Sequence, residues 1–242
     1  MSIIKLFCFP YAGGSASIFN KWKSYLNIYS GVELIPVELA GRGTRISEPL
    51  YAGLQEAVDD LYQIVSAKIG NTPYALFGYS LGGLLAYELA QKIKSVKNIR
   101  QPLHLFFSSM SAPYTGPNKN YHLMDNDEFK LRVIELGGTP PEFFDHPELV
   151  DFFLPMLRND FRLSETNLSE QKTDPFQCDI SIFLGKEDHE IYAEQINNWK
   201  IYTNGICAFH YFNGGHFFLH DEGAAITGLI SNVLMKCNHK HF

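Results

Sequence analysis

Short apolar runs alternate with amphipathic stretches along most of this chain. The apolar runs have the length of buried strands and cover residues 3–9, 32–37, 74–77, 103–107, 180–184 and 208–212. Apolar positions recur at helical spacing in the stretches 17–26, 54–65, 81–93, 192–199 and 221–235. Strands that alternate with helices imply right-handed crossovers between parallel strands. The pattern therefore predicts an α/β fold, a mostly parallel sheet flanked by helices.

One region departs from this alternation. Residues 113–174 contain no convincing strand, and Asp125 with Glu128 forms a capping box in front of a helix at residues 129–136. Aromatic side chains are dense in this region, so we expect it to pack as a helical insertion over one edge of the sheet. The expected organisation is a single domain with a core of residues 1–112 and 175–242 and a helical lid insertion at 113–174.

Composition and charge narrow the class of protein. The 242 residues include 26 acidic and 20 basic side chains, a net charge of -6, which argues against the basic face that nucleic acids require. No apolar run approaches the roughly 18 residues of a membrane span. The first strand is not a signal peptide, and the scattered cysteines indicate reduced thiols: Cys8, Cys178, Cys207 and Cys237. We expect a cytoplasmic monomer that binds neither nucleic acid nor membrane.

The motif Gly78-Tyr79-Ser80-Leu81-Gly82 is the strongest chemical signal in the chain. It matches G-x-S-x-G, the turn that exposes a serine between a strand and a helix in α/β-hydrolases. Residues 74–77 read as the strand before it and 81–89 as the helix after it. This context favours a nucleophilic Ser80 over a tight structural turn, and it makes the expected fold an α/β-hydrolase fold.

A nucleophilic serine needs a base, which this fold places late in the chain. His216 follows a predicted strand through Asn213-Gly214-Gly215, a loop at the carboxyl edge of the sheet. His220 is the alternative base, while His104 and His210 lie inside predicted strands and are expected to pack there.

The base needs a carboxylate to orient it. Asp188 follows the fifth predicted strand through Gly185-Lys186-Glu187, which brings it to the same edge of the sheet as the His216 loop. An ordinary solvated loop acid is the alternative interpretation. Asp160 is the rival acid, but it lies in the insertion, so we expect Asp188 to complete the triad.

An oxyanion hole needs two convergent backbone N–H groups. Leu81 supplies one after the nucleophile, and the second is expected from the small residues of Phe9-Pro10-Tyr11-Ala12-Gly13-Gly14. The segment Gly41-Arg42-Gly43 has two glycines, so it lacks the third glycine of a dinucleotide loop, and it also lacks that loop's placement between a strand and a helix. No metal-ligand spacing is present, so we expect chemistry without a metal or soluble cofactor.

Short motifs with a family likeness extend over nearly the whole chain: Phe9-Pro10-Tyr11-Ala12-Gly13-Gly14, Leu39-Ala40-Gly41-Arg42-Gly43, Gly78-Tyr79-Ser80-Leu81-Gly82-Gly83, Phe153-Leu154-Pro155 with Arg158-Asn159-Asp160, Gly185-Lys186-Glu187-Asp188 and Gly214-Gly215-His216-Phe217-Phe218. With these motifs the chain resembles the type II thioesterases, stand-alone α/β-hydrolases that accompany nonribosomal peptide and polyketide synthases. One departure is Tyr79, where that family commonly has histidine.

The resemblance implies a function and its residues. Acyl thioesters on the phosphopantetheine arm of acyl or peptidyl carrier proteins would be hydrolysed, with carriers as transient partners. The nucleophile, acid and base would be Ser80, Asp188 and His216, and the oxyanion donors the backbone N–H groups of Leu81 and Ala12. Substrate contacts are expected from Tyr11, Tyr79 and Phe217, and the insertion would be a lid.

Other functions use the same residues. A carboxylesterase or lipase would employ the same triad on oxygen esters, and an acyltransferase would replace water by an amine or hydroxyl. A non-catalytic carrier-binding protein would have no need of a complete triad. Four aromatic residues would either pack the insertion on the sheet or line an acyl chamber: Phe143, Phe144, Phe152 and Phe153. Four basic residues would either be ordinary surface charges at a helix end or form a carrier-docking surface: Lys92, Lys94, Lys97 and Arg100.

Overall fold

The sheet sets the frame of the molecule. The computed structural model describes residues 3–26, 31–113, 119–166, 174–191 and 193–240. Within them, six strands form one sheet in the order β2-β1-β3-β4-β5-β6, and all neighbours pair in parallel. The strands are β1 (Ile4–Phe9), β2 (Val32–Pro36), β3 (Tyr74–Tyr79), β4 (His104–Ser108), β5 (Asp179–Gly185) and β6 (Cys207–Phe212). The predicted parallel α/β architecture is confirmed.

The strand order has a switch point between β1 and β3. From β1 the chain moves outward to β2 and then returns to the other side of β1 to add the remaining strands. Ligands of open parallel sheets bind beyond the carboxyl ends of the strands at such a point, because the flanking loops diverge there. The loops after β1 and β3 begin at Pro10 and Ser80, and they are the two that sequence analysis selected.

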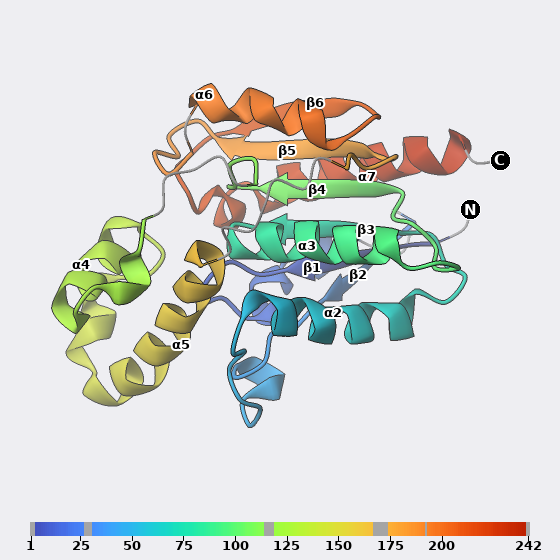
Figure 1. The fold of residues 1–242 in the computed structure, drawn as a ribbon. Helices are drawn as coiled ribbons and strands as arrows, with labels where there is room; N and C mark the ends of the chain where they lie inside the picture. The colour runs from blue at the N-terminus through green and yellow to red at the C-terminus, as the bar shows by residue number, and fades with distance from the viewer. Residues whose placement is uncertain (1–2, 27–30, 114–118, 167–173, 192, 241–242) are drawn as a thin grey trace.

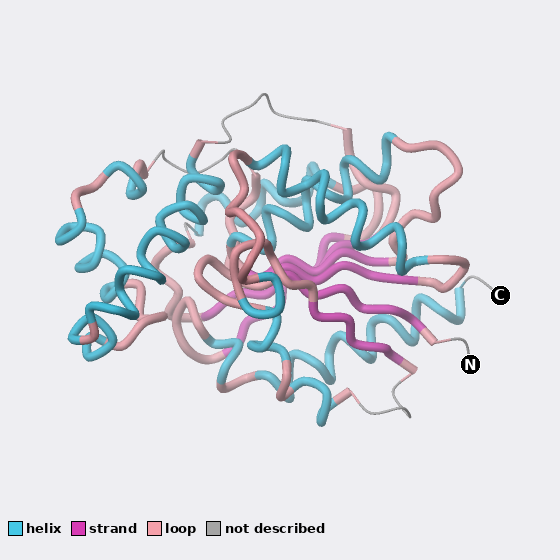
Figure 2. Tube along the Cα trace, turned by 90° about the horizontal axis from the view of Figure 1, so that it is seen from below, coloured by secondary structure: helices cyan, strands magenta, loops and turns pink. Residues whose placement is uncertain are grey.

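Helices cover both faces of the sheet (Figures 1 and 2). On one face α2 (Leu54–Ile69) lies beside α3 (Leu81–Ser95), and on the other α1 (Trp22–Tyr25) lies beside α7 (Gly223–Lys240). Alternate residues of each strand feed the two resulting cores, since strand side chains point to opposite faces. Phe7 therefore packs with the α2 and α3 side, whereas Leu6 packs with the α7 side.

Two predicted helices differ from the structure. Residues 17–26 form a 3-10 turn at Ala16–Phe19 followed by the short α1, and Ser15 rather than Ser17 caps the turn. Phe19 ends the 3-10 turn and Trp22 begins α1, and the two buried rings pack edge to face. Residues 192–199 likewise become α6 (Ala193–Ile196) and a 3-10 turn (Asn197–Tyr202), with residue 192 outside the described residues.

Between β4 and β5, residues 119–166 lie beyond the carboxyl ends of the strands (Figure 1). These described residues contain helices and no strand: 3-10 turns at Tyr121–Leu123 and Pro141–Asp145, α4 (Asn126–Glu135) and α5 (Pro147–Glu165). Asp125 caps α4 as predicted, because its carboxylate accepts the N–H groups of Asp127 and Glu128. A small apolar cluster around Phe129 and Leu154 joins α4 to α5. We call residues 119–166 the lid.

Across the described residues, none of the helices combines the length and the apolar character that crossing a membrane requires.

Candidate active site

Ser80 occupies a strained turn between β3 and α3. Its φ of 53° and ψ of -115° lie in a region that side-chain-bearing residues rarely adopt. The flanking glycines permit the turn, since a Cβ at Gly78 would lie 2.1 Å from the Gly82 carbonyl oxygen. A Cβ at Gly82 would lie 2.2 Å from the Phe9 carbonyl oxygen. The turn therefore depends on close backbone contact between α3 and the end of β1.

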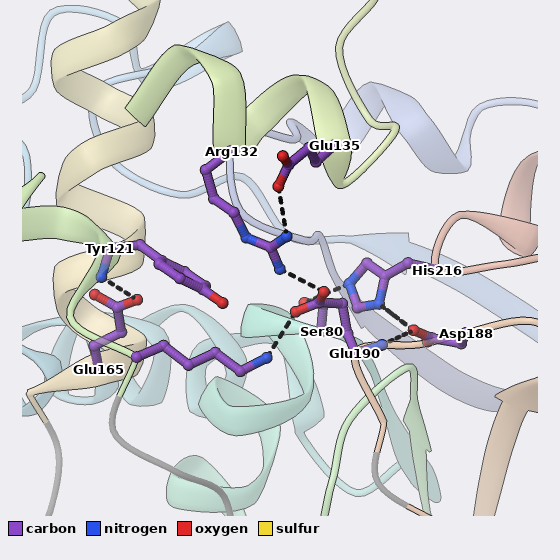
Figure 3. A network of polar contacts seen from close by, with 9 residues as sticks. Ser80, Tyr121, Arg132, Glu135, Glu165, Asp188, Glu190 and His216 are labelled. Carbon is purple, nitrogen blue, oxygen red and sulfur yellow. Dashed lines mark hydrogen bonds and ion pairs between the residues drawn. The ribbon is translucent and has the colours of Figure 1, made fainter. Parts of the chain in front are cut away.

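His216 and Asp188 lie next to Ser80 in the order that a triad requires (Figure 3). His216 Nε2 is 3.2 Å from Ser80 Oγ, and His216 Nδ1 is 3.0 and 3.1 Å from the two Asp188 carboxylate oxygens. A proton on Nδ1 is donated to Asp188, which leaves Nε2 free to accept the serine proton. The Asp188 side chain is fully buried.

The loops that carry Asp188 and His216 support each other. The Glu187 N–H donates to the Gly214 carbonyl over 3.1 Å, and the Lys186 N–H donates to the Phe212 carbonyl over 2.9 Å. Both bonds continue the pairing of β5 with β6 beyond the sheet. Neighbouring parallel strands thus carry the acid and the base to one edge, as the sequence pattern indicated.

The rival residues have other partners. Asp160 is fully buried in α5 and binds Arg42 rather than a histidine. His220 Nε2 lies 3.0 Å from the Tyr11 hydroxyl. His104 lies buried in β4, with Nε2 2.9 Å from Ser181 Oγ, and burial lowers the pKa of His104 to about 4. None of these groups contacts Ser80.

Tyr79 does not occupy the substrate-contacting position expected for it. It is fully buried among the residues on the α7 side of the sheet, because consecutive strand residues point to opposite faces. Its hydroxyl donates to the His216 carbonyl over 2.5 Å, and Ser109 Oγ donates to the same carbonyl over 3.1 Å. Tyr79 therefore supports the backbone of the histidine, a role that its place in the motif did not indicate.

An apolar cavity of about 260 Å³ opens beside Ser80 and His216. Tyr11, Ala12 and Phe217 line it, as expected for substrate contacts and an oxyanion donor. The lid contributes most of the remaining wall: Val133, Leu136, Gly138, Thr139, Pro140, Phe143, Phe153, Leu157 and Phe161. Phe143 and Phe153 thus face the cavity, whereas Phe144 packs on Phe143 and Phe152 is 53% exposed.

The two expected oxyanion donors come from the start of α3 and from the loop after β1. Leu81 is the first residue of α3, and helices leave the N–H groups of their first turn without intrahelical partners. Ala12 follows β1 in a turn closed by the Gly14 N–H donating to the Tyr11 carbonyl over 2.9 Å. Both groups lie near Ser80, because α3 packs against the end of β1.

A polar network joins the lid to the Asp188 loop (Figure 3). The Glu190 N–H donates to Asp188 Oδ1 over 3.0 Å, while its carboxylate accepts from Arg132 of α4 over 2.5 Å and from Lys119 over 2.7 Å. Burial alone would raise the pKa of Glu190, but the two cations outweigh it and lower that pKa below its usual value. Sequence analysis did not single out Glu190, because its partners are distant in the chain.

Comparison with known proteins identifies the family of this chain. A model described as a thioesterase domain matches residues 4–237. The chain belongs to the thioesterase family. It is 34% identical to the linear gramicidin dehydrogenase LgrE of Brevibacillus parabrevis, over 96% of this chain and 88% of that protein.

Two solved structures superpose on nearly the whole chain. ClbQ from the colibactin NRPS/PKS pathway has a TM-score of 0.91 at 33% identity, covering 98% of this chain and 99% of that one. The type II thioesterase BorB from the borrelidin biosynthetic cluster has a TM-score of 0.83 at 29% identity, covering 95% and 92%. The α/β-hydrolase fold and the resemblance to type II thioesterases are confirmed.

The dehydrogenase name of LgrE has no counterpart in the motifs of this chain. A dinucleotide loop needs a three-glycine turn between a strand and a helix. Gly41-Arg42-Gly43 follows β2 but leads into a 3-10 turn at Gly43–Arg45, and Arg42 is buried against Asp160. In the described part of the chain, no three His, Cys, Asp or Glu side chains lie close enough together to bind a metal ion.

Proposed function

We propose that this thioesterase-family protein hydrolyses acyl thioesters on the phosphopantetheine arm of carrier proteins that serve nonribosomal peptide or polyketide synthases. The observation that carries the proposal is the Ser80–His216–Asp188 arrangement at the floor of an apolar cavity beneath the lid. The relatives support the choice of pathway, since ClbQ belongs to an NRPS/PKS pathway. Removal of stalled or misprimed acyl groups would free the carrier for another cycle.

The first half of the reaction forms an acyl-enzyme. Ser80 Oγ attacks the thioester carbonyl while His216 Nε2 takes the serine proton. The backbone N–H groups of Leu81 and Ala12 stabilise the negative oxygen of the tetrahedral intermediate. The intermediate collapses as the carbon–sulfur bond breaks, and the imidazolium returns its proton to the phosphopantetheine thiol.

The second half releases the acyl group. His216 removes a proton from water as the water attacks the ester carbonyl, and the Ser80 oxygen then leaves with that proton. Asp188 holds the imidazole in the required tautomer and stabilises the imidazolium in both halves. The products are a free carboxylic acid and a free thiol, so the scheme uses neither a metal nor a soluble cofactor.

The cavity indicates the kind of acyl group that fits. Its lining consists of apolar and aromatic side chains apart from Ser80, His216, Thr139 and the Tyr11 hydroxyl. A charged acyl chain buried there would have no partner of opposite charge, which makes its burial unfavourable. We therefore expect uncharged, largely apolar acyl groups to be the preferred substrates.

Carrier proteins would be transient partners, and the enzyme would act as a cytoplasmic monomer. No disulfide joins the four cysteines, which suits a compartment where thiols stay reduced. Burial raises the pKa of the Cys178 thiol to about 12 and that of Cys207 to about 11. Such thiols are poor nucleophiles, which leaves Ser80 as the proposed nucleophile.

Mass spectrometry of an octanoyl-phosphopantetheinyl carrier protein tests the function. The wild-type protein should remove the octanoyl mass as free octanoate, while Ser80→Ala should leave the carrier acylated. Ser95→Ala is the matched control, because Ser95 is exposed at the far end of the same helix, and it should retain wild-type turnover.

Two results would overturn the thioesterase proposal. Cleavage of a p-nitrophenyl ester with the acyl carrier left intact would identify an oxygen-ester hydrolase instead. Failure on both substrates, with Ser80 unreactive toward a fluorophosphonate, would leave a non-catalytic binding protein.

A further inference from the structure

A buried ion pair between Arg42 and Asp160 contacts the loop after β1. Arg42 donates from its two terminal nitrogens to the two oxygens of Asp160, over 2.6 and 2.7 Å. The side chains are 3% and 0% exposed. Burial of two charges is unfavourable unless good geometry and further hydrogen bonds compensate for the lost hydration. The further partners of this pair therefore indicate what it does.

The remaining contacts of the pair converge on the loop that carries Ala12. Asp160 Oδ2 accepts the Gly13 N–H over 2.7 Å, and Arg42 donates to the Gly14 carbonyl over 3.2 Å. Gly13 has a φ of 78°, a conformation that favours glycine, and a Cβ there would meet Leu157 at 2.9 Å. The pair thus holds the peptide groups that immediately follow Ala12.

Three distant segments meet at this point. Arg42 comes from the loop after β2, Asp160 from α5 of the lid, and Gly13 from the loop after β1. The two charged partners are 118 positions apart in the chain. Arg42 also balances the charge of the Asp160 carboxylate, which accepts the N–H of the residue that follows Ala12. The Arg42–Asp160 pair therefore influences the position of the loop that carries the Ala12 N–H group.

We propose that Asp160 and Arg42 are positioning residues that aim the Ala12 N–H at the oxyanion. The proposal accounts for two motifs that the triad does not use, Leu39-Ala40-Gly41-Arg42-Gly43 and Arg158-Asn159-Asp160. It rests on the proposed function only in that Ser80 attacks a carbonyl. The pair would act in the transition state, because the negative oxygen exists only there.

Asp160→Asn tests the proposal, because it preserves the shape of the side chain and removes its charge. The substrate is the octanoyl thioester of N-acetylcysteamine. Two probes accompany it: octylboronic acid, which forms a tetrahedral adduct with Ser80, and the S-octyl thioether of N-acetylcysteamine, which lacks a carbonyl. We expect kcat to fall about 10- to 100-fold with KM within about twofold. Affinity for the boronic acid should fall by a similar factor, and affinity for the thioether should stay within about twofold.

Arg162→Met is the matched control. Arg162 lies on the same helix and donates to the Tyr51 and Ala52 carbonyls, so its loss removes a tether of α5 without touching the Ala12 loop. We expect its kcat and boronic-acid affinity to remain within about threefold of wild type. A purely structural role for Asp160 would make the two variants alike.

Defined outcomes would overturn the inference. The first is an Asp160→Asn variant whose kcat and boronic-acid affinity are both unchanged. The second is an Asp160→Asn variant that loses affinity for the boronic acid and for the thioether by the same factor. If Asp160→Asn does not fold, Arg42→Lys replaces it, since lysine keeps the positive charge without the two-pronged contact. Wild-type protein that binds the boronic acid but does not cleave the thioester would remove the proposed function and leave this inference standing.

Discussion

The nucleophile turn and the lid are held in place by different kinds of interaction. At the turn, Gly78 of β3 and Gly82 of α3 allow the backbone of α3 to contact β3 and β1 at distances that no side chain would permit. At the lid, the link from α4 to the core includes the charged contacts of Arg132 and Lys119 with Glu190. Steric contact tolerates almost no displacement, whereas hydrogen bonds to charged groups exchange with water. The comparison predicts a rigid nucleophile facing an adjustable cover.

The largest expected effect comes from crowding the nucleophile turn. Gly82→Ala would place a Cβ 2.2 Å from the Phe9 carbonyl oxygen and 2.6 Å from that of Pro10. We expect a loss of about 3 kcal/mol or more in the free energy of unfolding, measured by urea denaturation. Gly228→Ala in α7 is the control, because nothing lies within 4 Å of its Cβ position. It should raise stability by up to about 1 kcal/mol, and equal behaviour of the two variants would contradict the steric account.

The stability of the sheet should also depend on pH, because His104 lies buried in β4. Burial lowers the pKa of His104 to about 4, nearby Asp179 partly opposes that shift, and His210 adds to it. Because the folded-state pKa lies below the unfolded value, neutral His104 supports the fold above about pH 6.5, and this support is lost as the pH falls toward 4.

Urea unfolding at pH 7.5 and 4.5 measures this contribution. His104→Gln should reduce the acid-induced loss of stability by about 2–3 kcal/mol relative to wild type. His146→Gln, at an exposed position, is the control for the substitution itself. An acid-induced loss of the same size in all three proteins would show that His104 does not contribute.

Breaking the lid network should loosen the lid and leave the sheet intact. Glu190→Gln removes the charge that holds Arg132 and Lys119, an effect of about 1–2 kcal/mol. Amide hydrogen exchange in α4 should therefore become about 5- to 30-fold faster while β4 stays unchanged. The effect should shrink in concentrated NaCl.

Glu135→Gln provides the control for Glu190→Gln. Glu135 is 66% exposed and contacts Arg132 without reaching the Asp188 loop, so its loss should change exchange less than about twofold. Faster exchange in β4 of Glu190→Gln would mean that the lid and the sheet open together, which would end the distinction between the two regions.

The smallest effect is expected at the basic end of α3. Lys92 and Lys94 lie in the last turn of this helix, about 17 Å or more along its axis from Ser80, and pair with Asp59 and Asp174. Replacing both lysines by Ala should leave kcat/KM for the octanoyl carrier within about twofold. A loss above about tenfold on the carrier, with no loss on the small thioester, would show that carriers dock on this face.

Much of the architecture could be predicted because its signals are local. Each strand appears as a short apolar run, and the nucleophile turn requires glycine at fixed positions next to Ser80. Asp188 and His216 could be placed because the ends of neighbouring parallel strands meet at one edge of the sheet. The helix predicted at residues 17–26 was wrong in form, because the chain forms a 3-10 turn and a separate short α-helix there. Apolar residues three positions apart, such as Phe19 and Trp22, are neighbours in both kinds of helix, so their spacing does not distinguish them.

Taken alone, the sequence determined the parallel α/β core, the strained serine turn and the edge where acid and base would meet. Only the tertiary structure decided that Tyr79 supports the His216 backbone and that Asp160 binds Arg42 and the Ala12 loop. Patterns within a strand or a turn report which face is buried and where glycine is required. The partner of a buried polar group is chosen by whichever distant segment packs against it, and spacing along the chain carries no record of that choice.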